Sequence, residues 1–323
     1  MSSKSFDVAI VGGGPAGLSA ATTLARSLRS VLVVDGGQPR NAPADGAHNV
    51  LGQENISPTE LLDRGRAEAR SYGADFVSDE VIDAARGDNG TFTLTLAGGD
   101  TVDARRVLLA TGLVDELPEV PGVPELWGST VLHCPFCHGW EVRGQRIGIL
   151  GTGPMAVHQT LLFRQLSDDV TLFTHTMGEI EPAEREQLSA LDVAIIDQTV
   201  DHLDIADGTL AAVALTDGDR IERDALVVAP KFVVRSALYF SLGGTLTDHP
   251  MGQYVAADPM GATDIPGVWA AGNVTNLAAT VAVSMGAGVT AAGALHMDLI
   301  TEDTRRAVQA RRSRALADAQ EAV

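Results

Sequence analysis

The stretch that decides the fold is FDVAIVGGGPAGLSAATTLARSL, residues 6–28. It begins with the pattern of a buried strand, continues with a glycine turn, and ends in a helical run of alanine and leucine. Gly12, Gly14 and Gly17 have the spacing G-x-G-x-x-G, which permits a tight turn, close approach of a pyrophosphate, and close packing of helix on strand. The next strand ends at Asp35, where a carboxylate can bind ribose hydroxyls. The stretch therefore predicts a dinucleotide-binding βαβ unit.

The same pattern occurs a second time, in the stretch QRIGILGTGPMAVHQTLLFRQL that begins at Gln145. Here Gly151, Gly153 and Ala156 fit G-x-G-x-x-A after a strand. Two mononucleotide-binding units in one chain predict two nucleotide sites, or one site and one relic. We therefore expect the α/β class, with two Rossmann-like three-layer domains of the kind that binds FAD or NAD(P).

Length and charge limit the classes of protein that this chain can represent. Its 323 residues suit two domains. Its formal net charge of −19 repels nucleic acid and anionic membranes, so neither is expected as a partner. The amino-terminal residues show no basic segment followed by a long apolar stretch, so we expect a cytoplasmic protein. The uncharged stretch Val274–Met297 is long enough to span a membrane, but its many Ala, Gly, Ser and Thr residues favour a buried, close-packed helix.

Both cysteines of the chain lie in HCPFCHGW, residues 133–140. A metal site is one interpretation, because His133, Cys134, Cys137 and His138 are four potential zinc ligands. Structural zinc sites usually take their ligands from two separated segments, so we expect no metal here. Inert packing of two buried cysteines is a second interpretation. A redox pair is the third, since C-x-x-C lets one sulfur attack and the other resolve, and a cytoplasmic cysteine pair is rarely a structural staple.

Two further motifs decide between NAD and FAD for the first unit. VLLATG, residues 107–112, and GVWAAGN, residues 267–273, resemble the second and third motifs of the two-domain flavoprotein disulfide reductases. The order of segments resembles that of the low-molecular-weight thioredoxin reductases over nearly the whole chain. In that family the third motif usually ends in Gly-Asp, and the acid binds the ribityl chain of FAD. Here it ends in Gly272-Asn273, and an amide can still hydrogen-bond a hydroxyl group.

The resemblance implies one FAD-binding domain made of residues 1–116 and 245–323. Residues 117–244 are inserted as an NAD(P)-binding-like domain that carries the C-x-x-C motif. The segments DGGQPRN and HNVLG are implied as FAD contacts, and Val81 is implied to lie beside the adenine. The FAD-binding residues that the resemblance implies are Gly12, Gly14, Pro15, Ala16, Gly17, Asp35, Gly37, Gln38, Arg40, Asn41, His48, Asn49, Val81, Ala110, Thr111, Gly112, Gly272, Asn273, Thr280 and Val281. A homodimer is implied as well.

The resemblance to flavoenzymes favours the redox interpretation of the two cysteines. It implies that Cys137 lies against the flavin and exchanges electrons with it, whereas Cys134 faces outward and forms the mixed disulfide with substrate. Thioredoxin reductases typically continue C-x-x-C with Asp, but this chain has His138. The stretch LPEVPGVPELWGSTVLHCPFCHGWE is more similar to the dithiol oxidases that close disulfides in gliotoxin- and holomycin-type natural products. Histidine titrates near neutrality, so we expect His138 or His133 to take a proton from a substrate thiol.

The residues after the second glycine motif argue against a nicotinamide cofactor. NADPH enzymes of the family bind the 2′-phosphate with arginines in a His-Arg-Arg motif after the next strand. This chain reads VTLFTHTMGEI there, with no Arg or Lys between Val170 and Glu184, although Lys231 or Arg235 could supply a cation from elsewhere. NAD would favour an acid at the strand end, where the chain has Thr174. We therefore expect FAD as the cofactor and do not expect NADPH.

We predict an FAD-dependent thiol–disulfide oxidoreductase of the thioredoxin reductase-like family. It is expected to oxidise a small dithiol to a disulfide, with O2 as acceptor and H2O2 as product. Three alternatives stay open: an NADPH-dependent thioredoxin reductase, a disulfide reductase that takes electrons from ferredoxin or another protein, and a non-catalytic FAD-binding redox sensor. The expected partner is a small-molecule dithiol or disulfide, and the alternatives add a thioredoxin-like protein or ferredoxin.

Overall fold

The computed structural model describes residues 5–321, and the side chains of residues 5–318. Contacts divide the chain into two compact units. Unit 1 comprises Met1–Gln38, Leu62–Leu113 and Val234–Val323, and unit 2 comprises Pro39–Leu61 and Val114–Val233. Each unit has its own parallel sheet and its own core, which confirms the predicted α/β class with two Rossmann-like units. The finer domain boundaries predicted from the sequence, at residues 116, 117, 244 and 245, stay a prediction.

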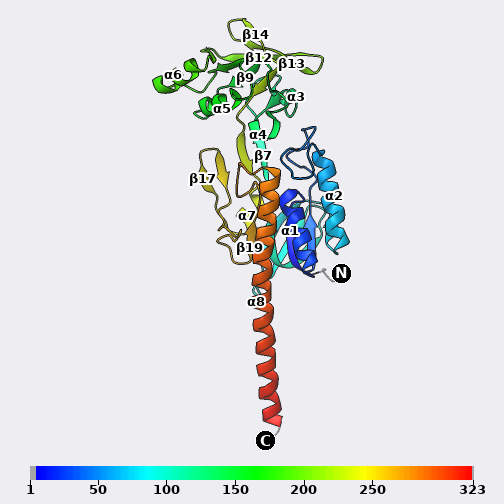
Figure 1. Cartoon of the computed structure of the whole chain (residues 1–323). Helices are drawn as coiled ribbons and strands as arrows, with labels where there is room; N and C mark the ends of the chain where they lie inside the picture. The colour runs from blue at the N-terminus through cyan, green and yellow to red at the C-terminus, as the bar shows by residue number, and fades with distance from the viewer. Residues whose placement is uncertain (1–4, 322–323) are drawn as a thin grey trace. The chain divides into compact units, whose positions relative to one another are not determined.

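Figure 1 labels the helices and strands along the chain. The helices are α1 (Pro15–Arg26), α2 (Pro58–Ser71), α3 (Val123–Leu126), α4 (Pro135–His138), α5 (Ala156–Phe163), α6 (Pro182–Ala190), α7 (Ala237–Ser241) and α8 (Val281–Glu321). The strands are β1 (Ser5–Val11), β2 (Val31–Val34), β3 (Asp75–Val77), β4 (Val81–Arg86), β5 (Phe92–Leu96), β6 (Thr101–Leu109), β7 (Leu113–Glu116), β8 (Val131–Leu132), β9 (Ile147–Leu150), β10 (Val170–Phe173), β11 (Ala194–Ile196), β12 (Val200–Ala206), β13 (Thr209–Leu215), β14 (Arg220–Glu222), β15 (Ala225–Val227), β16 (Lys231–Val234), β17 (Thr247–His249), β18 (Gly252–Tyr254) and β19 (Val268–Ala270).

A seven-stranded sheet forms the centre of unit 1, in the order β3-β2-β1-β6-β5-β4, with β19 also paired to β6. The strands β3, β2, β1, β6 and β19 run parallel, whereas β4 and β5 add an antiparallel hairpin. All four residues of β2, the run VLVV, are buried. Such an uninterrupted apolar run is expected for a parallel strand that is covered on both faces.

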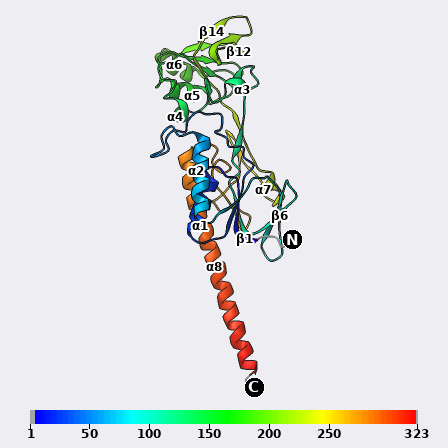
Figure 2. The ribbon, with the colours of Figure 1, turned by 90° about the vertical axis from the view of Figure 1, so that its right-hand side faces the viewer.

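Helix α1 packs between the sheet and α8, and Figures 1 and 2 show the two helices side by side. The apolar side chains of α1 recur at helical spacing, so that Ala20, Ala21 and Leu24 are fully buried. A Cβ atom on Gly288 of α8 would lie 2.1 Å from the carbonyl oxygen of Ala16. The two helices therefore approach closely only because residue 288 is glycine.

Helix α8 is buried along one face and exposed along the other. Ala291, Ala292, Leu295 and Leu299 belong to the core, whereas Met297 is exposed. The expectation of a buried, close-packed helix is therefore correct for only one face. Within residues 5–321, α8 is the one helix that is long and apolar enough to cross a membrane, with 33% of its most apolar window buried, and core helices of soluble proteins meet the same criteria.

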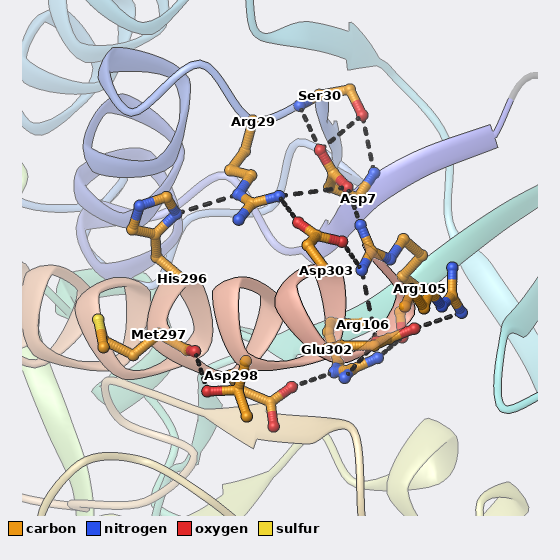
Figure 3. Close-up of polar contacts among 12 residues, drawn as sticks. Asp7, Arg29, Ser30, Arg105, Arg106, His296, Met297, Asp298, Glu302 and Asp303 are labelled. Carbon is orange, nitrogen blue, oxygen red and sulfur yellow. Dashed lines mark hydrogen bonds and ion pairs between the residues drawn. The ribbon is translucent and has the colours of Figure 1, made fainter. Parts of the chain in front are cut away.

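A network of ion pairs attaches α8 to the sheet of unit 1, as Figure 3 shows. Asp303 accepts hydrogen bonds from Arg29 at 2.7 Å and from Arg105 at 2.5 Å. Arg106 donates to Glu302 at 2.7 Å and to Asp298 at 2.6 Å. Burial alone would raise the pKa of Glu302, but the hydrogen bond from Arg106 and the neighbouring arginine charges outweigh it and lower the pKa. These contacts are the last that α8 makes with the sheet, since every side chain from Thr304 to Asp318 is exposed.

Unit 2 is built on a five-stranded parallel sheet in the order β11-β10-β9-β15-β8. Helices α5 and α6 contribute apolar side chains to the core on one face, including Val157, Phe163 and Leu188. The antiparallel sheet β12-β13-β14 contributes to the core on the other face through Leu203 and Val213. The sheet is therefore covered on both sides, as a Rossmann-like unit requires.

Candidate active site

The first glycine loop of unit 1 joins the end of β1 to the start of α1. Gly12 has φ +108°, and a Cβ there would lie 2.3 Å from the carbonyl oxygen of Ala110. A Cβ on Gly17 would lie 2.0 Å from the carbonyl oxygen of Gly12, so the helix begins directly against the turn. A Cβ on Gly14 would meet no atom within 4 Å, and no side chain caps the amino terminus of α1. Gly14 and the free N–H groups of α1 therefore leave room and donors for a pyrophosphate.

Asp35 follows β2 and lies beside this loop. Its carboxylate Oδ2 would be 2.6 Å from a Cβ on Gly13, and it accepts a hydrogen bond of 2.9 Å from Arg66 of α2. The backbone N–H of Gly37 donates to the other carboxylate oxygen at 3.3 Å. The arrangement holds the Asp35 carboxylate at the strand end, where this residue type binds ribose hydroxyls in dinucleotide sites.

The second and third motifs of the chain converge on the same loop. Gly272 has φ +84°, and a Cβ there would lie 2.9 Å from the Cβ of Ala16 in the first turn of α1. Thr111 donates from its hydroxyl to the carbonyl oxygen of Arg235 at 2.8 Å. Segments that are more than a hundred residues apart in the sequence thus come together around the start of α1. The residues of this cradle fit an FAD dinucleotide.

The redox pair of unit 2 is presented by the short helix α4. Cys134 is the residue before the helix, and the backbone N–H groups of Cys137 and His138 donate to its carbonyl oxygen at 3.2 and 3.1 Å. The two sulfur atoms lie 2.6 Å apart. Cys137 is exposed and Cys134 is half-buried. The pair is therefore positioned to form a disulfide with little movement of the backbone.

The two thiols differ in acidity. The hydrogen bond from the Cys137 thiol, assisted by backbone N–H groups, lowers the pKa of Cys134 to about 7. The same hydrogen bond, together with the partial loss of solvent around its sulfur and the negative charge that develops on Cys134, raises the pKa of Cys137. In the reduced pair Cys134 therefore carries the thiolate, which is the nucleophilic form of a cysteine.

Arg40 supplies a positive charge to this site. Its guanidinium donates two hydrogen bonds to the buried carboxylate of Asp115, at 2.7 and 2.6 Å, and its Cζ lies 4.9 Å from the ring centre of Phe232. The charge of Arg40 contributes to the lowered pKa of Cys134. Because the bidentate pair holds the guanidinium in place, this charge is a permanent part of the site.

His133 is held from several sides. Its Nδ1 lies 2.9 Å from the carbonyl oxygen of Val228, so Nδ1 carries the proton and donates it. The amide of Gln159 donates to the carbonyl oxygens of His133 and Val228 at 3.0 and 3.3 Å. The ring of Phe232 meets the imidazole edge-on with centres 5.4 Å apart. Burial lowers the pKa of His133, so the ring is neutral at pH 7 with Nε2 as its unprotonated nitrogen.

His138 lies at the end of α4, close to the charges of Glu141 and His48, and is less buried than His133. Burial lowers the pKa of His138, and the negative charge of Glu141, which acts to raise this pKa, offsets only part of that effect. His48 donates from Nδ1 to Glu54 at 2.7 Å, and its Nε2 lies 3.5 Å from Glu141. Asn49 donates from its amide to the carbonyl oxygen of Phe136 at 2.6 Å, which ties this segment to the redox helix. A neutral, partly accessible histidine of this kind can accept a proton.

The second glycine loop is contacted at its first glycine by the segment that follows β10, whereas a Cβ on Gly153 would meet no atom within 4 Å. The backbone N–H of Thr176 donates to the carbonyl oxygen of Gly151 at 3.0 Å, and a Cβ on Gly151 would lie 2.6 Å from the sulfur of Met177. His175 accepts a hydrogen bond on Nδ1 from the backbone N–H of Val200 at 3.2 Å, and burial lowers its pKa. The segment after β10 therefore packs on the first glycine and offers no cationic side chain.

The predicted site residues divide between the two units. Most of the residues implied as FAD contacts lie in unit 1, and Gly12, Ala16, Gly17, Ala110 and Gly272 contact one another there. Arg40, Asn41, His48 and Asn49 lie in unit 2, with the cysteines and both histidines. The individual roles of all these residues stay predictions. Within residues 5–318 no group of three or more His, Cys, Asp and Glu side chains is arranged to bind a metal.

Sequence patterns did not indicate several residues that surround the redox pair. Asp115 binds Arg40, and Glu141 lies beside His48. Gln159 and Phe232 both contact His133. None of these four residues has a spacing in the sequence that marks it as part of the site. The one sequence signal for Asp115 and Phe232 is position, because they lie in the strands β7 and β16. The contacts themselves arise only when those strands assemble.

Comparison with known proteins agrees with this geometry. A family model described as pyridine nucleotide-disulphide oxidoreductase matches residues 6–288. Thioredoxin reductase aclD of Aspergillus oryzae is 34% identical over 90% of this chain and 96% of that protein. Thioredoxin reductase tcpT of Claviceps purpurea is 34% identical over 84% of this chain and 87% of that protein. The crystal structure of HlmI superposes with a TM-score of 0.90 at 44% identity and covers 95% of this chain and 96% of its own.

These matches confirm the resemblance inferred from the glycine motifs and the cysteine pair. The family implies a bound flavin, and the dinucleotide cradle of unit 1 has the glycines, the free helix terminus and the acid that such a cofactor needs. The C-x-x-C pair of unit 2 supplies two adjacent thiols of different acidity. The chain belongs to the pyridine nucleotide-disulphide oxidoreductase family and is a thioredoxin reductase-like enzyme.

Proposed function

We propose that this enzyme oxidises a small dithiol to a disulfide and passes the electrons to O2 without using NADPH. In the overall reaction, two S–H bonds break and one S–S bond forms. The two electrons and two protons that are released convert O2 to H2O2. FAD, when bound, supplies the electron acceptor between the cysteine pair and O2.

The observation that carries this proposal is the lack of a cationic side chain in the segment that follows β10. This segment packs on the first glycine of the loop, where the N–H of Thr176 donates to the carbonyl oxygen of Gly151 and the sulfur of Met177 lies beside the same residue. The segment from Val170 to Glu184 contains no Arg or Lys, and its one histidine, His175, has a lowered pKa and is neutral. A 2′-phosphate would therefore find no cation there. Lys231, suggested by the sequence as a substitute, is paired with Glu116 at 3.3 Å.

The cysteine roles in this proposal follow the family resemblance. A substrate thiolate attacks Cys134 of the oxidised pair and forms a mixed disulfide, and Cys137 leaves as a thiolate. The second thiol of the same substrate then attacks the mixed disulfide, which releases the cyclic disulfide product and the reduced cysteine pair. The reduced pair carries the two electrons, and Cys137 is the proposed point from which they pass on.

His138 is the preferred base in this proposal. His133 is more deeply buried and its Nδ1–H is engaged by Val228, whereas His138 is partly accessible and lies near Glu141. Both imidazoles have lowered pKa values, so both are neutral and able to accept a proton at pH 7. Substituting His138 with Gln should therefore lower the rate of dithiol oxidation more at pH 6.5 than at pH 9, where substrate thiols ionise without help.

An anaerobic reduction experiment tests the function. Purified, flavin-loaded protein is mixed with NADPH or with dithiothreitol, and flavin bleaching is followed by absorbance. Rapid bleaching by the dithiol alone, with one H2O2 per dithiol on admission of air, is the expected result. Rapid bleaching by NADPH would contradict the proposal and favour a thioredoxin reductase. The matched control is Cys134→Ser, which should lose bleaching by dithiol and keep bleaching by light and a chemical reductant.

Two remaining outcomes separate the alternative functions. Bleaching by reduced ferredoxin, and by neither small reagent, would favour a protein-linked disulfide reductase. Slow bleaching by every reductant would favour a redox sensor. A cytoplasmic location and a homodimer are also proposed; the dimer is supported by the exposed apolar side chains Val283, Val289 and Met297, which share one face of α8. Light scattering after size exclusion measures this oligomeric state.

A further inference from the structure

The end of α8 carries a charge opposite to that of the rest of the chain. Residues 304–318, which we call the arm, contain five arginines and one aspartate, a net charge of +4. The whole chain carries −19, so the remainder carries −23. The family match ends at residue 288. The arm therefore lies outside the matched part of the fold, and the redox chemistry does not explain it.

The side chains of the arm are left uncovered by the rest of unit 1. Every one of them from Thr304 to Asp318 is exposed, including the apolar Val308 at 43% and Leu316 at 67%. Figures 1 and 2 both show this end of α8 running beyond the other elements of unit 1. The arm is therefore accessible to a partner.

The base of the arm is clamped to the sheet of unit 1, as Figure 3 shows. Asp303 accepts hydrogen bonds from Arg29 and Arg105. Glu302 accepts a hydrogen bond from Arg106. Beyond this clamp, four of the arm residues are alanine, which favours continuation of the helix. A helix that leaves a fixed base loses little further conformational freedom on binding, and this favours association.

Arg305, Val308, Arg312 and Leu316 share one face of the arm. They are spaced by three or four residues, which aligns side chains along a helix. Val308 also follows the exposed Met297 by about three helical turns, so this face continues the exposed face of α8 on which the proposed dimer rests. The arm therefore presents two cations and two apolar side chains together, which suits a surface that is acidic and partly apolar.

A second copy of this chain fits the arm better than other occupants. Two arms would repel each other, because each carries +4. Nucleic acid and anionic membranes attract the arm but are repelled by the −23 of the remainder. That same acidic remainder, in a second copy, attracts the arm.

We propose that in the homodimer the arm of each protomer docks on the acidic surface of its partner, through the face formed by Arg305, Val308, Arg312 and Leu316. This inference rests on the proposed dimer and not on the proposed dithiol chemistry. The arm then acts as a second, salt-sensitive contact between the protomers, in addition to the apolar face nearer the start of α8.

The test compares two double charge reversals in the purified, flavin-loaded protein. Arg305→Glu with Arg312→Glu reverses the docking face, whereas Arg311→Glu with Arg314→Glu makes the same change of charge away from that face. Hydrogen exchange of the peptide that covers the arm is measured by mass spectrometry in the dimer and after dilution to the monomer. The unmodified arm should exchange roughly tenfold or more slowly in the dimer. The first variant should lose this protection, and the second should keep most of it.

A variant that ends at Asp303 supplies a second measurement, by sedimentation velocity. The Kd of its dimer should be raised about tenfold or more at about 50 mM salt, and the difference should shrink at about 1 M salt, where charges are screened within about 3 Å. Flavin bleaching by dithiol should be unchanged in all three variants, so it reports the proposed chemistry separately.

Four outcomes would overturn the proposal or a part of it. An arm that exchanges equally fast in dimer and monomer would overturn docking while leaving the dimer intact. Equal effects of the two charge reversals would overturn the assigned face. Protection that appears only when poly-glutamate is added would overturn the second copy as partner and favour another acidic protein. A monomer at every concentration would overturn the dimer and the docking together.

Discussion

Replacing Cys137 with alanine should raise the pKa of the Cys134 thiol from about 7 toward the ordinary thiol value. The largest cause of the low pKa is the hydrogen bond that the Cys137 thiol donates across the 2.6 Å separation of the sulfurs. Alanine removes this donor and keeps α4, because alanine favours a helix. Burial, which raises the pKa of Cys134, then opposes only the weaker contributions of backbone N–H groups and Arg40.

The magnitude of this effect can be worked out from the pKa. With a pKa of about 7, half of the Cys134 thiols are ionised at pH 7. With the ordinary value of roughly 8.5, only about 3% are ionised at that pH. The midpoint of the pH profile is the better readout, because a thiolate of higher pKa is also more nucleophilic and partly compensates in rate. The expected change is an increase of about 1.5 pH units in this midpoint.

The assay is alkylation by iodoacetamide under argon, followed by intact mass. The chain contains only two cysteines, so Cys137→Ala reports Cys134 alone. The matched control is Cys137→Ser, whose hydroxyl can still donate a hydrogen bond and should keep part of the shift. A midpoint in Cys137→Ala that stays near 7 would refute the assignment of the low pKa to Cys137 and would assign it to the backbone and Arg40.

Three further predictions concern the framework of the site. Arg40→Leu leaves the buried Asp115 carboxylate unpaired and should lower the free energy of unfolding in urea by about 3 kcal/mol, with a smaller loss in Arg40→Lys. Gly12→Ala should lower the melting temperature sharply, because residue 12 has a positive φ and the added Cβ would lie 2.3 Å from a backbone carbonyl oxygen. Gly14→Ala should keep the melting temperature, because the added Cβ would meet no atom within 4 Å. It should weaken flavin binding, which is measured by fluorescence. The pKa of Glu302 is lowered in the folded state, so its contribution to stability is present above roughly pH 4.3 and is lost as pH falls further. The melting temperature of Glu302→Gln should therefore fall less steeply in acid than that of the unmodified protein.

The glycine motifs could predict the fold because each glycine meets a requirement that is local in the sequence. Gly12 needs a positive φ, and Gly17 lies against the turn that Gly12 makes. The hydrophobic periods of the flanking strand and helix then identify the βαβ unit without further information. The same logic located the C-x-x-C pair, since its two cysteines are held by one short helix.

Tertiary contacts decided what the sequence could not show. The charge of Arg40 next to the cysteines depends on Asp115, 75 residues away, and the tautomer of His133 depends on Val228. No periodicity connects such pairs. The start of helix α8 illustrates the same limit, because composition showed that the stretch up to Met297 lacks charge but not that Met297 is exposed while Leu295 is in the core.

The acidity order within the reduced pair does not by itself decide which sulfur departs from the oxidised pair. Thiol–disulfide exchange is faster when the departing thiol has the lower pKa. In the reduced pair Cys134 is the more stable thiolate, but that order depends on the S–H group of Cys137, which a mixed disulfide at Cys137 lacks. The proposed order, in which substrate pairs with Cys134 and Cys137 departs, therefore depends on what stabilises the Cys137 thiolate once Cys134 is bonded to substrate.

A bound flavin is the candidate for this stabilising group, and its effect can be measured. Alkylation of Cys137 in the Cys134→Ala variant is compared with and without flavin, with excess free flavin removed. If the proposed order holds, the Cys137 profile should shift to lower pH when flavin is bound, although steric protection would lower the rate at every pH alike. A profile with the same midpoint in both forms would contradict the idea that flavin stabilises the departing Cys137 thiolate.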